Sequence, residues 1–208
     1  MAEFVHVVAA SQGLLPDPCS TCLWWQTTTG SGATRNPEAD LERRLAWMHR
    51  LEQSWGSLGM VLQEGTSTLA ALQFAPVAAL ARAAHLPAGP TPEDAVLIYC
   101  LRGRLDRSAH EPSRLLHRAL AHLRRQRLTE VYAFARPLGS ADLCGLRNLC
   151  GLEFLRAHGF VIVRGGGDAF LMRLDLRGLL PSLVDAANGL RRLRPEPAAP
   201  SPATFWRS

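Results

Sequence analysis

Lysine is missing from this chain of 208 residues, so arginine supplies all 23 of the positive charges that do not depend on histidine. The chain is also rich in alanine, leucine and proline, and this composition most simply reflects a GC-rich genome. The net charge of +5 is therefore weak evidence for a nucleic-acid partner, and we do not expect one.

Long apolar runs are absent as well. No segment approaches the roughly 18 to 20 apolar residues that a membrane-spanning helix needs, so we expect no membrane partner. Residues 4–8 carry no basic leader, which argues against a secretory signal and favours the cytoplasm. No internal repeat is visible.

The length and a hydrophobic content of 47% predict one well-buried core, which we assign to a domain at residues 1–180. A helix is predicted at residues 181–194, and the Pro/Ala-rich residues 195–208 are predicted to be disordered. Arginines cluster at residues 118–127 and 191–194, where they form either solvated helix faces or a contact for a polyanion.

The five cysteines, an odd number, favour free thiols in a reducing cytosol. Cys19 and Cys22 have the spacing of a redox pair or of half a zinc site, whose other half would come from Cys144 and Cys150. The spacing of those two is unusual for metal ligands, so we predict no metal. In the simpler interpretation Cys19 and Cys22 pack as small hydrophobic residues.

The stretch at residues 94–127 predicts a buried strand, a polar loop and an amphipathic helix. Residues 95–101 are apolar and partly β-branched. Ser113 stands where a helix N-cap is expected, ahead of apolar residues at helical spacing. A strand that leads through a loop into a helix start can bind phosphate, because free backbone N–H groups and the helix dipole point at one place.

Other segments follow recognisable patterns. A helix is expected at residues 38–54, a hairpin around residues 64–67, and a partly helical excursion at residues 77–84. A strand is expected at residues 128–134, and a short helix stopped by Gly159 leads into strands at residues 161–164 and 170–176.

Several motifs in order resemble one protein family. The segment FLRAHGFVIVR at residues 154–164, with the strand that follows, is similar to the C-terminal half of the GCN5-related N-acetyltransferase (GNAT) family. The CSTCLWW segment at residues 19–25 resembles the opening of an actinobacterial-type subgroup with a CxxC-aromatic segment. WGSLG, LQFAP and PEDAVL, at residues 55–59, 72–76 and 92–97, agree with it. The resemblance covers roughly residues 4–180.

The resemblance implies an α+β fold with helices on both faces of a mixed, mostly antiparallel sheet. Six or seven strands are expected, splayed between those at residues 95–102 and 128–134. It also implies transfer of an acetyl group from acetyl-CoA to an unknown amine. The cofactor would be anchored at Leu101, Arg102 and Gly103, and its pyrophosphate would be held near Arg107, His110, Ser113 and Arg114. Tyr132 is the candidate acid and Glu130 a candidate base.

The phosphate loop departs from the family pattern of Arg/Gln-x-x-Gly-x-Gly/Ala, because it has no glycine at the expected positions. Glu111 brings negative charge and Pro112 removes one N–H donor, so we expect weak acetyl-CoA binding. Two functions stay open: an N-acetyltransferase, or a degenerate GNAT-fold protein that acts as a binding or regulatory module, with a protein partner or as a homodimer.

Overall fold

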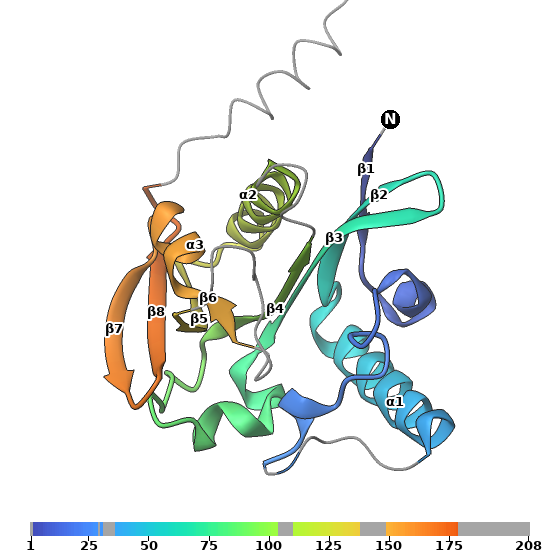
Figure 1. The fold of residues 1–208 in the computed structure, drawn as a ribbon, viewed down its shortest axis with the longest axis horizontal. Coiled ribbons are helices and arrows are strands. Elements are labelled where there is room, and N and C mark those ends of the chain that lie inside the picture. Colours follow the sequence, from blue (N-terminus) through green and yellow to red (C-terminus); the bar gives the residue numbers. More distant parts are fainter. Residues whose placement is uncertain (1, 29, 31–35, 104–109, 138–148, 179–208) are drawn as a thin grey trace, which may run out of the picture. The chain divides into compact units, whose positions relative to one another are not determined.

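The structure, a computed structural model, describes residues 2–28, 30, 36–103, 110–137 and 149–178. These residues form one mixed sheet with helices on both faces, as predicted (Figure 1), but the sheet has eight strands where six or seven were expected, because the two-residue β6 adds a further strand. The strand order is β1-β2-β3-β4-β5-β8-β7, and the short β6 pairs with β5. The strands are β1 (Glu3–His6), β2 (Gly59–Glu64), β3 (Ser67–Pro76), β4 (Val96–Gly103), β5 (Glu130–Arg136), β6 (Cys150–Gly151), β7 (Val161–Gly166) and β8 (Ala169–Asp175).

Helix α1 (Pro37–Trp55) begins where the sequence predicts it. The side chain of Asn36 accepts hydrogen bonds from the backbone N–H groups of Glu38 and Ala39, and proline at the first helical position needs no N–H partner. The 3-10 helices η3 (Val77–Ala79) and η4 (Ala81–His85) confirm the helical excursion after β3. Two further 3-10 helices, η1 (Ala9–Leu14) and η2 (Trp24–Gln26), lie in the connection between β1 and α1.

Helix α2 (His110–Arg125) starts three residues before the predicted N-cap, so Ser113 lies within the first turn instead. The reason is Pro112, whose fixed φ and missing N–H suit the first turn of a helix, where backbone donors have no partner within the helix. Five apolar side chains of α2 are buried against the sheet: Leu115, Leu116, Ala119, Leu120 and Leu123.

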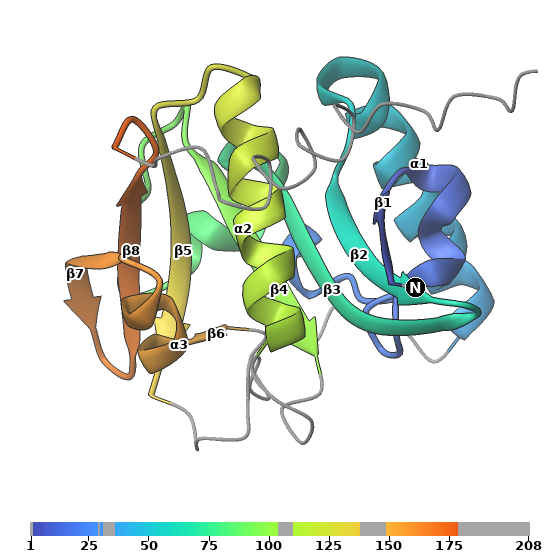
Figure 2. The same cartoon turned by 90° about the horizontal axis from the view of Figure 1, so that it is seen from above.

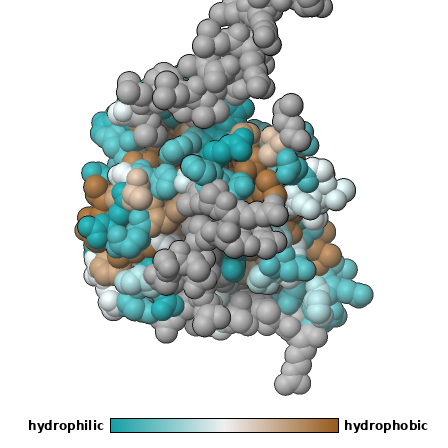
Figure 3. All heavy atoms as spheres, turned by 45° about the horizontal axis from the view of Figure 1, so that its top comes forward, coloured by the Kyte–Doolittle hydropathy of each residue, from teal (hydrophilic) through white to brown (hydrophobic). Residues whose placement is uncertain are grey.

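Helix α3 (Leu152–Ala157) ends as predicted at Gly159, which has a φ of +84° that favours glycine. The chain then forms the antiparallel pair β7 and β8. Strand β7 is one of the two edge strands of the sheet, and its Val161, Ile162 and Val163 are 55%, 45% and 49% exposed. Figure 3 shows apolar residues on the flank where β7 lies in Figure 1.

Contacts show which helix covers which face of the sheet. Gln73 of β3 and Tyr99 of β4 bond to Arg44 of α1, whereas Phe74 of β3 stacks on His122 of α2. We call these surfaces the α1 face and the α2 face. Neighbouring strand residues alternate between them. Figure 2 shows α1 and α2 on opposite sides of the sheet.

The sheet is split between β4 and β5, as predicted. These two strands are parallel and pair only at Leu97–Tyr132 and Ile98–Ala133, whereas the pairing of β4 with β3 continues to Gly103 (Figures 1 and 2). The predicted helix at residues 181–194 and tail at residues 195–208 lie outside the described residues.

Candidate active site

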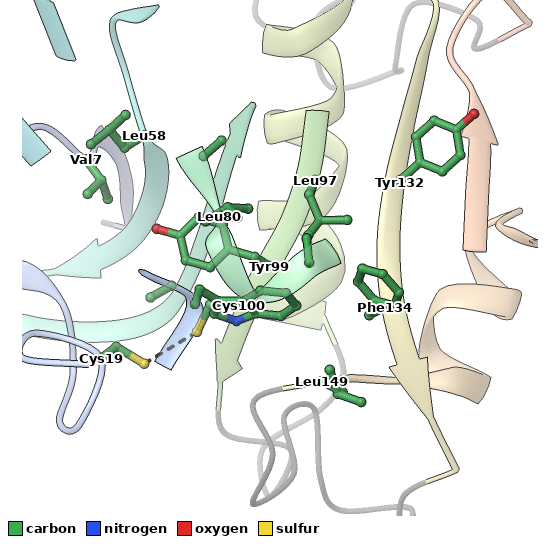
Figure 4. Packing of buried hydrophobic residues seen from close by; sticks show 14 of the residues in the cluster. Val7, Cys19, Leu58, Leu80, Leu97, Tyr99, Cys100, Tyr132, Phe134 and Leu149 are labelled. Carbon is green, nitrogen blue, oxygen red and sulfur yellow. Dashed lines mark hydrogen bonds between the residues drawn. The ribbon is translucent and has the colours of Figure 1, made fainter. Parts of the chain in front are cut away.

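The short strand β6 lies beside the split between β4 and β5. Ala135 of β5 pairs with Phe170 of β8 on one edge and with Cys150 of β6 on the other. Strand β6 therefore lies on the edge of β5 that faces β4. Leu149 and Cys150 are buried there, and Figure 4 shows Leu149 at the end where the strands diverge. An extended ligand that entered the split would lie between β4 and β6.

A register shift in β4 sits where the split opens. Gln73 of β3 pairs with Cys100 while the next residue, Phe74, pairs with Ile98, so Tyr99 is the extra residue of a β-bulge. The predicted cofactor residues Leu101, Arg102 and Gly103 follow this bulge. Leu101 is buried, and the other two are partly exposed at the end of β4.

The first turn of α2 holds three more of the predicted cofactor residues, while Arg107 lies outside the described residues. His110 and Arg114 are exposed and Ser113 is half-buried. The guanidinium of Arg114 lies 5.7 Å from the ring centre of Phe4. The turn thus combines basic side chains and the positive end of the helix dipole with the drawbacks of Glu111 and Pro112.

Ser113 is hydrogen-bonded to a histidine that the sequence motifs did not single out as a site residue. His158, just after α3, has Nε2 3.0 Å from Ser113 Oγ and Nδ1 2.7 Å from the backbone oxygen of Phe154. The ring of His117 lies beside it, with the ring centres 5.3 Å apart. This contact joins α2 to α3 on the α2 face.

On the α1 face, the guanidinium of Arg44 is buried beside β4. It is 1% exposed, and among the described residues no carboxylate forms an ion pair with it. It donates to Gln73 Oε1 and, at 3.3 Å, to the Tyr99 hydroxyl; the amide of Gln26, suitably oriented, also accepts from it.

Next to Arg44 is an enclosed cavity of about 10 Å³, enough for about one water molecule. Arg44 is one of the residues that line it, and the buried Arg44 Nε has no hydrogen-bond partner among the described residues. Burial raises the pKa of Tyr99 to about 12 although Arg44 opposes the shift, so the Tyr99 hydroxyl keeps its proton at neutral pH.

The two predicted catalytic residues lie together on β5. The Tyr132 hydroxyl donates to Glu130 Oε1 at 2.7 Å, and Arg173 of β8 lies 3.5 Å from Glu130 Oε2. Burial and the bond to Glu130 raise the pKa of Tyr132 to about 12. Their position is beside the paired part of the split, because Tyr132 pairs with Leu97. Glu130 remains about one-third exposed and can be reached from solvent.

Four described cysteines gather near the start of the split. Cys19 Sγ lies 3.5 Å from Cys100 Sγ (Figure 4), and none of the four cysteines is in a disulfide. The hydrogen bond to Cys100 and burial raise the pKa of Cys19, and burial raises that of Cys22. Buried thiols with raised pKa values are poor nucleophiles, which supports packing over redox chemistry. Cys144 lies outside the described residues.

Among the described residues, no cluster of three or more histidine, cysteine, aspartate or glutamate side chains is arranged to hold a metal ion. No helix in the same part of the chain is long and apolar enough to cross a membrane.

Comparison of the folded chain with solved structures identifies its architecture. The PaiA N-acetyltransferase of Thermoplasma acidophilum, in complex with coenzyme A, matches with a TM-score of 0.53 at 13% identity, over 84% of this chain and 99% of that one. An N-acetyltransferase of Staphylococcus aureus Mu50 matches with a TM-score of 0.52 at 14% identity, over 85% and 99%. The chain has the GNAT fold.

A third GNAT-fold match is YncA of Salmonella typhimurium with its cofactor acetyl-CoA, with a TM-score of 0.51 at 14% identity over 86% and 95% of the two chains. No protein-family model matches the sequence. No curated protein matches it either. At these identities the agreement concerns the fold, which the sequence motifs predicted.

Sequence reasoning missed the groups that the fold brings in from elsewhere. Arg44, Gln73 and Tyr99 come from three elements, and nothing in their local spacing marks them as a cluster. A polar residue in an otherwise apolar strand, such as Gln73, was the one signal in the sequence that a buried polar cluster lies there. His158 stands inside the FLRAHGFVIVR motif, which gave it no role of its own. The signal that could have identified it was a histidine at a helix end.

Proposed function

We propose that this protein is an N-acetyltransferase that moves an acetyl group from acetyl-CoA to an amine. The observation that carries the proposal is the split between β4 and β5 with the first turn of α2 beside it. The GNAT-fold matches in complex with coenzyme A or acetyl-CoA support it and favour it over a binding or regulatory module.

The cofactor would approach from the α2 face. Its pantetheine arm would lie in the split next to Leu101, Arg102 and Gly103, and its pyrophosphate at the first turn of α2. There the start of the helix and the side chains of His110, Ser113 and Arg114 would supply donors. Arg107, also predicted to contribute, lies outside the described residues. The donors present suit an anion, and acetyl-CoA when bound supplies the activated acetyl group.

The acceptor amine would approach from the α1 face, to which Glu130 and Tyr132 belong by strand alternation with Phe134, a neighbour of Trp25. Glu130 is the proposed base, because a part-exposed carboxylate can accept a proton from an ammonium group. Tyr132 is the proposed acid, because its raised pKa keeps the hydroxyl protonated at neutral pH. The hydroxyl can then give its proton to the CoA thiolate that leaves.

We further propose a cytoplasmic protein that acts as a homodimer or with a protein partner. The exposed edge of β7, with Val161, Ile162 and Val163, is the candidate contact surface. The chemistry of the site does not distinguish a small amine from a protein amine.

The test is the release of CoA thiol from acetyl-CoA by the purified full chain in the presence of a panel of amines, including amino acids, polyamines and peptides. We expect amine-dependent release with at least one acceptor and its loss in the Glu130→Gln variant. Release that is equal with and without every amine, and unaffected by Glu130→Gln, would contradict the proposed reaction.

A further inference from the structure

The buried arginine of α1 has no carboxylate partner among the described residues. Arg44 is 1% exposed, and Asp40, the buried carboxylate one turn earlier on the helix, lies 3.6 Å from Arg43 instead. Gln73 and Tyr99, which accept hydrogen bonds from the guanidinium, are uncharged. Because a buried charge without a counter-charge is costly, this arrangement favours an anion close to Arg44.

The ionisable groups near the guanidinium do not provide that negative charge. Burial raises the pKa of Tyr99 to about 12. The hydrogen bond to Cys100 and burial raise the pKa of Cys19, and burial raises that of Cys22. All three groups therefore keep their protons at neutral pH, and the positive charge of Arg44 is not offset by a phenolate or a thiolate from them.

Two buried N–H groups from different elements meet at one cavity. Arg44 Nε and Trp25 Nε1 are both buried and have no hydrogen-bond partner among the described residues. Both residues line the enclosed cavity of about 10 Å³. A single acceptor inside that cavity would lie within reach of a donor from α1 and a donor from η2.

A halide ion suits these two donors better than a water molecule does. Water accepts hydrogen bonds but also brings two hydrogens that need acceptors, and the thiols of Cys19, Cys22 and Cys100 that line the cavity are weak acceptors. A halide only accepts, and it brings the negative charge that Arg44 lacks. Carboxylates and phosphates are too large, because the space is close to that of one water molecule.

We propose that this cavity binds one chloride ion, held by the N–H groups of Arg44 and Trp25. Tyr99, the extra residue of the β-bulge in β4, lines the same cavity. The ion would therefore hold α1 and η2 over β4 at the place where the split opens. Its role is structural, so the proposal does not depend on the proposed acetyl transfer.

The first experiment measures the melting temperature of the full chain in sodium chloride, with sodium gluconate added to keep the ionic strength constant. Gluconate is too large for the cavity and serves as the reference anion. We expect the melting temperature to rise by about 3–6 °C for each tenfold increase in chloride above its dissociation constant, because the ion binds only the folded chain. A melting temperature that does not change with chloride would overturn the proposal.

Two tryptophan variants separate the site from general salt effects. Trp25→Phe removes one donor and keeps an aromatic ring in the core, so the dissociation constant for chloride should rise about tenfold or more. Trp24→Phe changes the indole that packs edge-on against Trp25 but does not line the cavity, and it should keep the full chloride dependence. Equal chloride dependence in Trp25→Phe and the unaltered chain would refute the site.

A direct readout uses the unaltered protein and does not depend on any variant folding. In long-wavelength X-ray diffraction from crystals grown in sodium chloride, chlorine and sulfur scatter anomalously and the oxygen of water does not. We expect one anomalous peak in the cavity, between Arg44 and Trp25 and separate from the cysteine sulfurs. Density there without an anomalous peak would identify a water molecule, and chloride peaks confined to the protein surface would show adventitious ions only; either result rejects the proposal.

Discussion

On the α1 face of the split, the Arg44 guanidinium is enclosed among neutral acceptors from three elements, and the cavity beside it holds about one water molecule. On the α2 face, Ser113 and His158 are only half-buried, and Ser113 Oγ lies 3.0 Å from His158 Nε2. The first cluster is buried, so it holds α1 against β3 and β4. The second is partly exposed beside the first turn of α2, so a ligand can reach it.

The same contrast separates the two tyrosines. Both have a pKa raised to about 12, chiefly by burial, but Tyr99 is bonded within the enclosed cluster, whereas Tyr132 is bonded to a partly exposed carboxylate. We expect Tyr132→Phe to lower kcat by about 10²- to 10⁴-fold, the usual contribution of a general acid or base.

The matched change, Tyr99→Phe, should lower the free energy of unfolding by about 1–3 kcal/mol and leave kcat within a few-fold. Thiol-release kinetics and urea unfolding of both variants provide the measurement. If Tyr99→Phe lost the activity and Tyr132→Phe retained it, the roles of the two faces would be reversed.

We expect the buried cluster around Arg44 to contribute strongly to the free energy of unfolding. Arg44→Ala removes the donor that Gln73, Tyr99 and Gln26 share and leaves a large cavity, so we expect a loss of about 3–5 kcal/mol in the free energy of unfolding. Arg50→Ala, in the exposed part of the same helix, should change it by less than about 0.5 kcal/mol. Equal effects of the two changes in urea unfolding would refute the structural role of Arg44.

The cysteines near this cluster provide a smaller test. Cys19→Ser places a hydroxyl where a buried thiol bonds to Cys100, and we expect a loss of about 1–3 kcal/mol. Cys22→Ser, at a partly exposed position, should cost less. Elemental analysis should find no bound zinc in the native protein; one zinc per chain would restore the metal interpretation of Cys19 and Cys22.

The clusters around Arg44 and around Ser113 and His158 show how much of the site the sequence could predict. The hairpin and the stop at Gly159 follow from local patterns and the split from the family resemblance, so their positions were predicted within a few residues. The start of α2 was placed too late, because Ser113 was treated as a cap while Pro112 was not treated as a first-turn residue. Arg44, Tyr99 and His158 meet partners 29 to 55 residues away, which no local pattern encodes.

A histidine in the last turn of α2, His122, gives the smallest predicted effect, on the pH dependence of stability. Burial, with nearby His6 and arginines, lowers the pKa of His122 to about 4. Below the ordinary imidazole value of about 6.5, the unfolded chain takes up a proton that the folded chain does not, so stability should fall as the pH drops toward 4. His122→Leu should flatten this decline in urea unfolding at pH 5 and pH 7.5; an unchanged decline would assign it to other groups.

The most direct test of the central claim is an NMR titration of the labelled full chain with acetyl-CoA, following the backbone amides. The account predicts saturable shifts at micromolar to low millimolar ligand that concentrate at residues 99–103, 110–114 and 149–151, around the split and the start of α2. The amides of β7 at Val161–Gly166 should serve as the unshifted reference. Saturable shifts confined to other parts of the chain, or none at several millimolar acetyl-CoA, would contradict it.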